Sequence, residues 1–341
     1  MSQLARSLEP ENLALRLLAQ RFRERGATPG GDGVAYSLWE KALLEPLCDF
    51  LARPGKEFRA RMVALAWELS GRHGGPPPEL SLLVEAIHAG SLIVDDIEDD
   101  STYRRGGRAL HLDYGLPRAL NAGNWLYFWP ADLIAELGLP PASELALHRV
   151  IGRTMLACHE GQALDLSTRV TELEQAEVPI VVLATTRLKT GKLFELAAAV
   201  GAIAAGAPSS TVRAVSEFGM ALGVGLQMLD DLGGIVSEHR CHKGHEDLLA
   251  ARPAWPWAWV AETTEPHVYA HLRVLGRQVN ARERHPELLA TELRGLIEAD
   301  GRKRVDEHLR QAFGDLSHKV GRSRALDEAL NEIQTLEKSY G

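Results

Sequence analysis

Hydrophobic and polar positions repeat with a helical period along almost the whole chain. Most long segments place apolar residues three or four positions apart, and β-branched runs such as PIVVLATT are short and lie within Ala- and Leu-rich windows. The pattern therefore predicts an all-α protein. We expect helices at about residues 10–25, 37–52, 56–72, 79–99, 116–137, 142–168, 173–202, 209–232, 245–263, 267–281, 286–299 and, with breaks, 303–338.

The expected helix 79–99 combines an apolar surface with a polar stripe. Its apolar residues, such as Leu83, Ile87 and Ile93, are numerous enough to bury the helix on nearly all sides. Steps of three or four residues nevertheless place a set of polar side chains within an arc of roughly 120° on one face. These are Glu85, His88, Ser91, Asp95 and Asp99.

Three other apolar segments carry polar residues in a similar arrangement. The sequence LACHEGQALDL has polar residues at every third position, VVLATTRLKTGKLFELAAA is interrupted by Thr and Lys, and FGMALGVGLQMLDDLGG ends in Gln and two Asp. Unpaired polar groups inside a bundle would cost a few kcal/mol each. Several helices with inward polar stripes therefore predict a bundle around a cavity that holds water or a ligand.

The acidic residues have the spacing of ligands for a hard cation. Asp95 and Asp99 lie one helical turn apart with Asp96 beside them, and Asp230 and Asp231 form a second pair. Magnesium prefers oxygen ligands and is commonly completed by substrate phosphates. Arginines follow the first cluster at 104 and 105, which favours a diphosphate ligand. A solvated helix end is the alternative for DDIEDD alone, whereas an EF-hand lacks the required Gly and terminal Glu.

Composition limits the other possibilities. The 341 residues are 45% hydrophobic and carry a net charge of -8 with dispersed Lys and Arg, so a nucleic-acid partner is not expected. Cys48, Cys158 and Cys241 fit neither a disulfide framework nor a zinc site. No signal peptide or membrane span is predicted, so we expect a cytoplasmic protein. No linker divides the chain, and we expect a single domain over 1–341 with 1–35 as an N-terminal helical extension.

Five segments together resemble one known family. SLIVDDIEDDSTYRRGGRALH resembles the first aspartate-rich motif, with paired arginines, of the trans-isoprenyl (polyprenyl) diphosphate synthases. RPGKEFRARM, GQALDL, LKTGKLFEL and FGMALGVGLQMLDD resemble further motifs of that family, in its order, over about residues 55–252. The first motif followed by NAGNWLYF is most similar to geranylgeranyl diphosphate synthases.

The resemblance implies a fold and a reaction. The fold is an all-α isoprenoid-synthase-type bundle around a central apolar cavity, in a homodimer. The reaction joins isopentenyl diphosphate to an allylic diphosphate (dimethylallyl, geranyl or farnesyl), with geranylgeranyl diphosphate as the expected all-trans product. About three Mg2+ ions per active site are implied, with Mn2+ as an alternative.

The resemblance also implies residue roles. The metals on the allylic diphosphate would be held by Asp95, Asp96, Asp99, Asp230 and Asp231. The allylic substrate would be supported by Arg104, Lys189, Thr190 and Gln227, which with the aspartates form the expected catalytic set. Lys243 and Arg252 would also bind substrate, and Arg252 stands where the family has another lysine. Isopentenyl diphosphate would be bound by Lys56, Arg59, His88 and Arg105.

A further set would determine product length. Gly90 and Ser91 are small where farnesyl-producing relatives are bulky, and the floor of the cavity would be formed by Tyr127, Phe128 and His159. Ordinary core packing is the alternative for the floor residues, and a hydrogen-bonded interior histidine is the alternative for His88 and His159. A basic helix start is the alternative for Lys56 and Arg59.

Two departures from the family pattern keep other functions open. Gly234 stands where many members have the last aspartate of the second motif, and the family's lysine would fall one position after Lys243, so that His242 is another candidate ligand. A class I terpene cyclase would not need a second diphosphate site, which the expected isopentenyl diphosphate residues argue against. A catalytically silent regulatory subunit of a heteromeric synthase is the other alternative.

Overall fold

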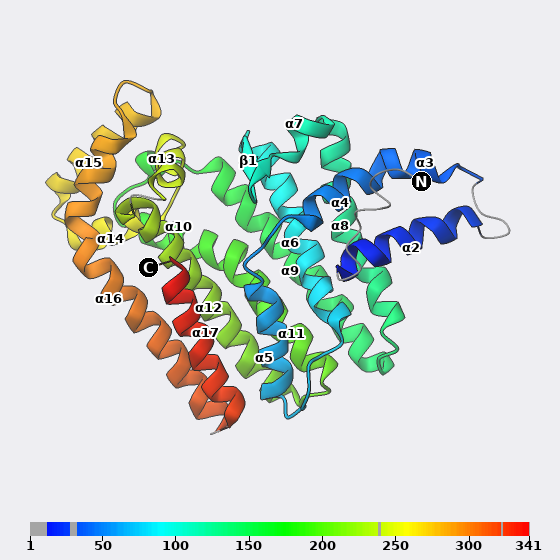
Figure 1. Ribbon diagram of the computed structural model, residues 1–341. Helices are drawn as coiled ribbons and strands as arrows, with labels where there is room; N and C mark the ends of the chain where they lie inside the picture. Colours follow the sequence, from blue (N-terminus) through cyan, green and yellow to red (C-terminus); the bar gives the residue numbers. More distant parts are fainter. Residues whose placement is uncertain (1–11, 28–32, 238–239, 322, 341) are drawn as a thin grey trace. The chain divides into compact units, whose positions relative to one another are not determined.

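The computed structural model describes residues 12–27, 33–237, 240–321 and 323–340. These residues are almost entirely helical (Figure 1), and the one exception to helices and loops among them is a short antiparallel pair of two-residue strands. The prediction of an all-α fold is confirmed. The chain divides into two compact units, residues 1–64 with 75–148, and residues 65–74 with 149–341.

The first unit contains the N-terminal helices and the first acidic motif. Its elements are α2 (Leu13–Ala27), α3 (Tyr36–Trp39), the π-helical turn η1 (Glu40–Leu44), α4 (Glu45–Ala52), most of α5 (Phe58–Leu69), α6 (Pro78–Glu98), β1 (Tyr103–Arg104), β2 (Gly107–Arg108), α7 (Leu110–Tyr114), α8 (Leu116–Glu136) and the start of α9 (Pro141–Ser167).

The second unit contains the remaining motifs. After the rest of α9 come the 3-10 turn η2 (Val170–Glu172), α10 (Val178–Thr186), the π-helical turn η3 (Arg187–Gly191), α11 (Lys192–Ala204), α12 (Ser209–Val236), α13 (Cys241–Leu249), α14 (Trp255–Thr263), α15 (Pro266–Asn280), α16 (Pro286–Val320) and α17 (Arg324–Tyr340).

Helices α6 and α8 form the centre of the first unit. They cross where Gly90 faces Gly123, and a Cβ at Gly90 would lie 2.7 Å from the Gly123 carbonyl oxygen. The absence of side chains at this crossing lets the two backbones approach closely. Around it Leu83, Ile87 and Ile93 are at most 1% exposed, so the apolar surface expected for this helix is buried.

Helix α12 is the centre of the second unit, where it packs against α11, α16 and α17. A Cβ at Gly223 would lie 2.9 Å from Cα of Gly191, so α12 passes η3 almost backbone to backbone. The long α16 and the C-terminal α17 run beside one another (Figure 1). This packing places the polar end of α12 next to η3.

Several expected boundaries differ from the observed ones. The expected break near residue 300 is absent, and α16 continues through Gly301 without interruption. A Cβ at Gly301 would lie 3.0 Å from the side chains of Leu232 and Trp259, so glycine is the residue that fits this close packing. The expected helix 245–263 is two helices, α13 and α14, separated at residues 250–254, where Pro253 lies. The expected helix 173–202 begins only at Val178 and contains the π-helical turn η3.

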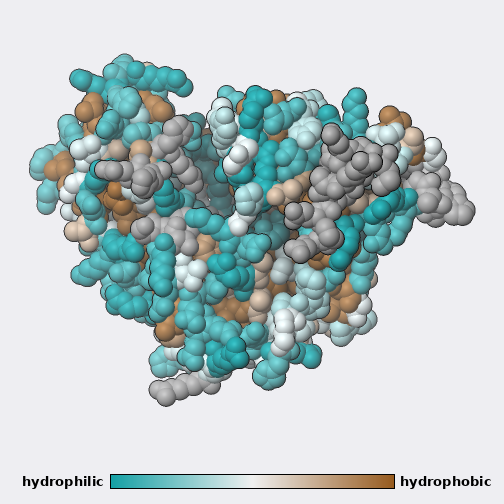
Figure 2. All heavy atoms as spheres, in the orientation of Figure 1, coloured by the Kyte–Doolittle hydropathy of each residue, from teal (hydrophilic) through white to brown (hydrophobic). Residues whose placement is uncertain are grey.

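The surface drawn in Figure 2 is hydrophilic over most of its area, with smaller hydrophobic patches between. Within the described ranges, no helix is both long and apolar enough to cross a bilayer.

Candidate functional site

The first acidic motif lies at the C-terminal end of α6. Asp99 caps the helix, and its N–H donates to the carbonyl of Asp95 at 2.9 Å, so the two carboxylates leave the same side of the last turn. The Asp95 side chain is 24% exposed and Asp99 is exposed. Both carboxylates are therefore accessible to a cation.

Asp96 has a different environment from its neighbours. It is fully buried, and its Oδ1 accepts a hydrogen bond from Nε of Arg104 at 2.6 Å. Its Oδ2 has no hydrogen-bond partner among the described residues, and burial raises the pKa of this carboxyl. A carboxylate enclosed in this way anchors Arg104. The metal-ligand role that the resemblance implied for Asp96 stays a prediction.

A β-hairpin directs the two arginines after the motif. The turn between β1 and β2 holds Arg105 and Gly106 at positive φ, 50° and 76°. Arg104 extends back toward Asp96, and the guanidinium of Arg105 lies 3.6 Å from the Cβ position of Gly55. The hairpin thus places Arg105 against the RPGKEFR segment, in which Lys56 is an exposed residue before α5.

His88 and Arg59 form a partly buried polar contact within the first unit. Nη1 of Arg59 lies 3.0 Å from Nε2 of His88, and because a guanidinium only donates, the histidine proton is on Nδ1. Burial, together with the charges of Arg59 and Arg105, lowers the pKa of His88 well below 6.5. Its Nδ1 is buried without a hydrogen-bond partner in the part of the chain described. A neutral N–H donor is therefore available for an anion.

Glu85 belongs to the same polar stripe. Desolvation raises the pKa of its carboxyl, while the charges of Arg59 and Arg105 and a hydrogen bond from the backbone of Ala60 act in the opposite direction. The structure thus brings together Arg59, His88 and Arg105, as the sequence predicted. It adds Glu85, for which the sequence analysis proposed no role although it identified the stripe.

In the second unit a chain of hydrogen bonds joins η3, α12 and α14. The hydroxyl of Thr190 donates to Gln227 at 2.8 Å, and the Gln227 amide donates to Asp231 at 2.7 Å. The backbone N–H of Trp255 donates to the other oxygen of Asp231 at 2.9 Å. Burial is the largest cause that raises the pKa of Asp231 to about 7. Thr190 and Gln227 lie together as predicted, because Gly191 and Gly223 let their helices approach closely.

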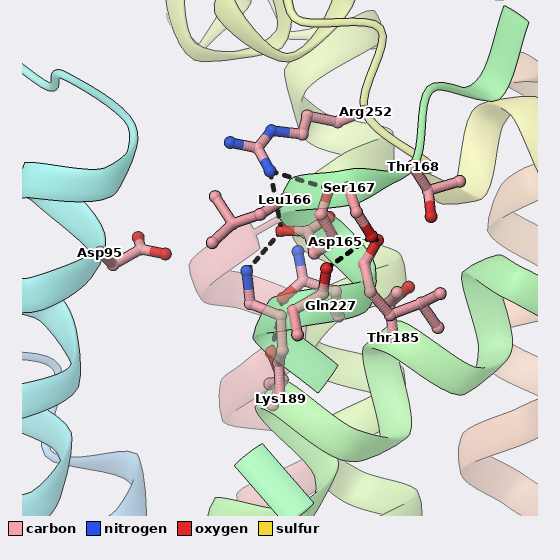
Figure 3. Close-up of polar contacts among 12 residues, drawn as sticks. Asp95, Asp165, Leu166, Ser167, Thr168, Thr185, Lys189, Gln227 and Arg252 are labelled. Carbon is pink, nitrogen blue, oxygen red and sulfur yellow. Dashed lines mark hydrogen bonds and ion pairs between the residues drawn. The ribbon is translucent and has the colours of Figure 1, made fainter. Parts of the chain in front are cut away.

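A second group links α9, η3 and the segment before α14 (Figure 3). Nζ of Lys189 lies 2.5 Å from Oδ2 of Asp165, and Nη1 of Arg252 lies 3.3 Å from the same oxygen. The predicted residues Lys189 and Arg252 are therefore neighbours. Asp165 was not predicted as a site residue, although it is the aspartate of the GQALDL segment.

The second acidic motif has a cation of its own. Arg240 forms an ion pair with Asp230, a contact that the sequence analysis missed because the arginine lies in an irregular segment. At Gly234, where relatives have a third aspartate, the backbone of Gly244 in α13 packs directly against α12. For Lys243 and His242, the other candidate ligands, the structure describes only the backbone, within α13.

The carboxylates of the two acidic motifs form only incomplete sets of ligands for magnesium. Among the residues described, no group of three or more His, Cys, Asp or Glu side chains comes together to hold a metal ion. Asp95 and Asp99 form one accessible pair, whereas Asp230 of α12 forms an ion pair with Arg240. Magnesium is commonly held by one or two carboxylates with water and substrate phosphates, so these donors suit an ion that binds together with a substrate.

The residues expected to limit product length lie in different environments. Gly90 is buried at the crossing with α8, where its Cβ position is 3.1 Å from the ring of Tyr127, so helix packing accounts for its small size. The Ser91 hydroxyl donates to the carbonyl of His88. Phe128 is 76% exposed and His159 is exposed, so in the single chain neither lines an interior cavity, and their floor role stays a prediction.

The match to known proteins agrees with this arrangement. A family model described as polyprenyl synthetase matches residues 40–291. The chain belongs to this family.

Individual relatives support the assignment over part of the chain. A geranylgeranyl diphosphate synthase of Sulfolobus acidocaldarius is 30% identical over 54% of this chain and 56% of its own length. A geranylgeranyl pyrophosphate synthase of Eremothecium gossypii is 34% identical over 56% of this chain and 60% of its own. The chain thus matches little more than half the length of these curated relatives.

A solved structure matches over a much longer range. The geranylgeranyl pyrophosphate synthetase of Pyrococcus horikoshii superimposes with a TM-score of 0.72 at 22% identity, covering 96% of both chains. This similarity establishes the polyprenyl synthetase fold for the present chain.

Proposed function

We propose that this polyprenyl synthetase family member is a short-chain trans-prenyltransferase. It condenses isopentenyl diphosphate with dimethylallyl, geranyl or farnesyl diphosphate, and its product is geranylgeranyl diphosphate. The observation that carries the proposal is the presence of two separate groups of cationic side chains. Arg59 and Arg105 lie with neutral His88 in one unit, and Lys189 lies with Arg252 in the other.

The first group suits the diphosphate of isopentenyl diphosphate. Arg59 and Arg105 supply charge, and Nδ1–H of His88 supplies a donor that has no partner among the described residues. Because His88 is neutral, it donates to phosphate oxygen without adding a third positive charge to a buried position. The substrate diphosphate would satisfy the buried N–H.

The second group suits the allylic diphosphate. Lys189, Thr190 and Arg252 would hold the leaving group, with Asp230 of the same unit as a ligand of an associated magnesium ion. Asp95 and Asp99 would bind magnesium as an accessible pair in the first unit. Bound magnesium would neutralise charge on the departing diphosphate. Similarity to the geranylgeranyl diphosphate synthases named above supports this substrate class and the twenty-carbon product.

The reaction follows from this arrangement of charge. The allylic C–O bond breaks, and the positive side chains retain the diphosphate while the apolar surroundings exclude water from the allylic cation. The alkene of isopentenyl diphosphate attacks that cation and forms the new C–C bond. Loss of one proton to the departed diphosphate restores a double bond and completes a five-carbon extension.

The principal test is an assay of the purified chain. It is incubated with Mg2+, isopentenyl diphosphate and each of the three allylic diphosphates, and products are separated by chromatography after phosphatase treatment. Twenty-carbon geranylgeraniol is expected as the main product, and no chain elongation is expected without isopentenyl diphosphate.

Two outcomes would support the rival functions. A cyclic hydrocarbon formed without isopentenyl diphosphate would indicate a class I terpene cyclase. Failure to release diphosphate under any condition would indicate a silent regulatory subunit. Fifteen- or twenty-five-carbon products would refute the assigned chain length but not the transferase activity.

The same proposal includes a homodimer. Large apolar side chains are exposed on three helices of the single chain, with Phe128 on α8 at 76%, Leu156 on α9 at 65% and Ile180 on α10 at 69%. Exposed apolar residues of this size favour burial against a second copy. Light scattering should give twice the chain mass, and Phe128→Glu should shift the protein toward the monomer. An unchanged dimer in that variant would exclude Phe128 from the interface.

A further inference from the structure

Asp165 contacts two cations in the second unit with a single carboxylate oxygen. Its Oδ2 lies 2.5 Å from Nζ of Lys189 and 3.3 Å from Nη1 of Arg252 (Figure 3). The side chains of Asp165 and Arg252 are each 14% exposed, and that of Lys189 is 29% exposed. The three groups are therefore mostly desolvated but still accessible from outside.

We propose that Asp165 is a positioning residue that holds Lys189 and Arg252 side by side as one cationic pair for the diphosphate of the allylic substrate. The inference rests on the proposed prenyltransferase function. It assigns a role to Asp165 and explains why an arginine, rather than a lysine, occupies position 252.

Electrostatics requires an anion between the two side chains. Two positive charges that share one contact oxygen repel each other strongly where water is partly excluded. One carboxylate offsets a single charge, so the group as a whole keeps a net charge of +1. Asp165 thus permits the two cations to lie together without cancelling their attraction for a diphosphate.

The guanidinium of Arg252 also binds the backbone of α9. Its Nη1 lies 3.0 Å from the carbonyl oxygen of Asp165, which belongs to the last turn of the helix. Carbonyls in that turn have no partner within the helix, and a cation there is favoured by the helix dipole. Arg252 therefore binds both the backbone and the side chain of one residue, for which the planar guanidinium is better suited than an ammonium group.

Lys189 reaches Asp165 because of the local backbone. It lies in η3, a π-helical turn that interrupts the regular hydrogen bonding between α10 and α11. Gly161, one turn before Asp165, lets α9 approach Leu188 so closely that a Cβ at Gly161 would lie 2.5 Å from that of Leu188. The separation between α9 and η3 thus determines the contact between the carboxylate and the amine.

The first test asks whether the carboxylate of Asp165 positions Lys189 and Arg252. Asp165→Asn keeps the size of the side chain and removes its charge, so the two cations lose their common anchor. We expect kcat to fall about 10- to 100-fold, as for removal of other groups that orient a site residue, with KM for isopentenyl diphosphate changed less than twofold. Asp165→Glu, which restores the carboxylate, should recover part of kcat.

The second test addresses the guanidinium. Arg252→Lys keeps the charge and loses the planar donor group, and we expect roughly a tenfold loss of kcat. Calorimetric titration with a non-reactive allylic thiolodiphosphate measures binding without turnover. Both Asp165→Asn and Arg252→Lys should bind this analogue at least fivefold more weakly than the wild type.

Matched controls come from a similar contact on α16, where Arg304 bridges Asp300 and Glu262. Asp300→Asn and Arg304→Lys make the same chemical changes and should leave kcat and analogue binding within twofold of the wild type. Circular dichroism establishes that each variant folds. If Asp165→Asn does not fold, Arg252→Lys and its analogue titration decide the question.

The outcomes distinguish this inference from the proposed function. A wild-type protein without transferase activity refutes the function. An active wild type with Asp165→Asn or Arg252→Lys within twofold of it, in both kcat and analogue binding, refutes only the positioning role. An equal loss in the α16 controls would likewise refute it, because the effect would then reflect general destabilisation.

Discussion

Gly161 of α9 lies against Leu188 of η3, and a Cβ on the glycine would be 2.5 Å from the Cβ of Leu188. Such a separation excludes any larger residue without movement of one helix. We expect Gly161→Ala to lower the free energy of unfolding by about 1–3 kcal/mol, the usual cost of overpacking, and to reduce transferase activity. Urea denaturation and the product assay measure the two effects.

The control for this prediction lies in the same helix. A Cβ on Gly152 would meet no atom within 4 Å, so Gly152→Ala should keep activity and raise stability by about 0.5–1 kcal/mol through helix propensity. Equal effects of the two substitutions would contradict the proposed role of the α9 to η3 contact.

Restoring the third aspartate of the second acidic motif should not improve this protein. Gly234 packs directly against the backbone of Gly244, and its Cβ position is 3.2 Å from Cα of Gly244. We expect Gly234→Asp to displace α13 and to lower the melting temperature, with activity at or below the wild-type level. Gly295→Asp on α16 is the control, because a Cβ there would meet no atom within 4 Å. It should change neither the melting temperature nor the activity. Higher activity in Gly234→Asp would show that α13 can adjust.

Asp96 and Asp99 should respond differently to the same substitution. Asp96→Asn would leave the partly buried guanidinium of Arg104 without its main charged partner, and we expect a loss of about 3 kcal/mol in unfolding free energy. Asp99→Asn removes an exposed carboxylate and should change stability by less than about 0.5 kcal/mol while lowering activity. Similar denaturation curves for the two variants would exclude an anchoring role for Asp96.

The buried neutral histidine predicts a loss of stability in acid. The pKa of His88 lies well below 6.5 in the folded chain, whereas an unfolded histidine takes up a proton near that value. Below pH 6.5 the unfolded state therefore binds more protons, and stability falls by up to about 1.4 kcal/mol per pH unit until the folded pKa is reached. His88→Gln should lose less stability between pH 6.5 and 5 than the wild type.

Glu85 changes the pH dependence of stability in the direction opposite to His88. The effect of His88 must therefore be measured as a difference between the wild type and His88→Gln. The pKa of Glu85 is raised above the ordinary carboxyl value of 4.5, so above that pH the folded state holds more protons and stability falls as pH rises. The difference between the wild-type and His88→Gln curves isolates the histidine. An exposed histidine variant, His318→Gln, should follow the wild-type curve. Parallel curves for His88→Gln and the wild type would mean that folding does not lower the pKa of His88.

Local sequence patterns were sufficient for most of the helices. The polar stripe on α6 and the capped end at Asp99 depend on positions within one helix, where a period of 3.6 residues determines which side chains share a face. The interruption of the expected helix 173–202 was not predicted, because a π-helical turn adds one residue without a clear sequence signal. Gly301 likewise suggested a break, but close packing against Leu232 and Trp259 makes glycine suitable inside α16.

The sequence predicted which residues belong to the candidate site more completely than it predicted what each residue contacts. Asp95 and Asp96 are adjacent in sequence and have the same chemistry. Only their burial in the structure shows that Asp95 is accessible, whereas Asp96 anchors Arg104. The partner of Asp230 lies in an irregular segment, so no periodicity could identify Arg240.

The sequence by itself determined that the chain is helical and that its chemistry involves carboxylates and cations suited to diphosphate, because helical period and residue type are local properties. Only the tertiary structure decided which charges contact each other. Asp165 meets both Lys189 and Arg252 because Gly161 allows two helices to approach, and such distances depend on packing between segments far apart in the chain.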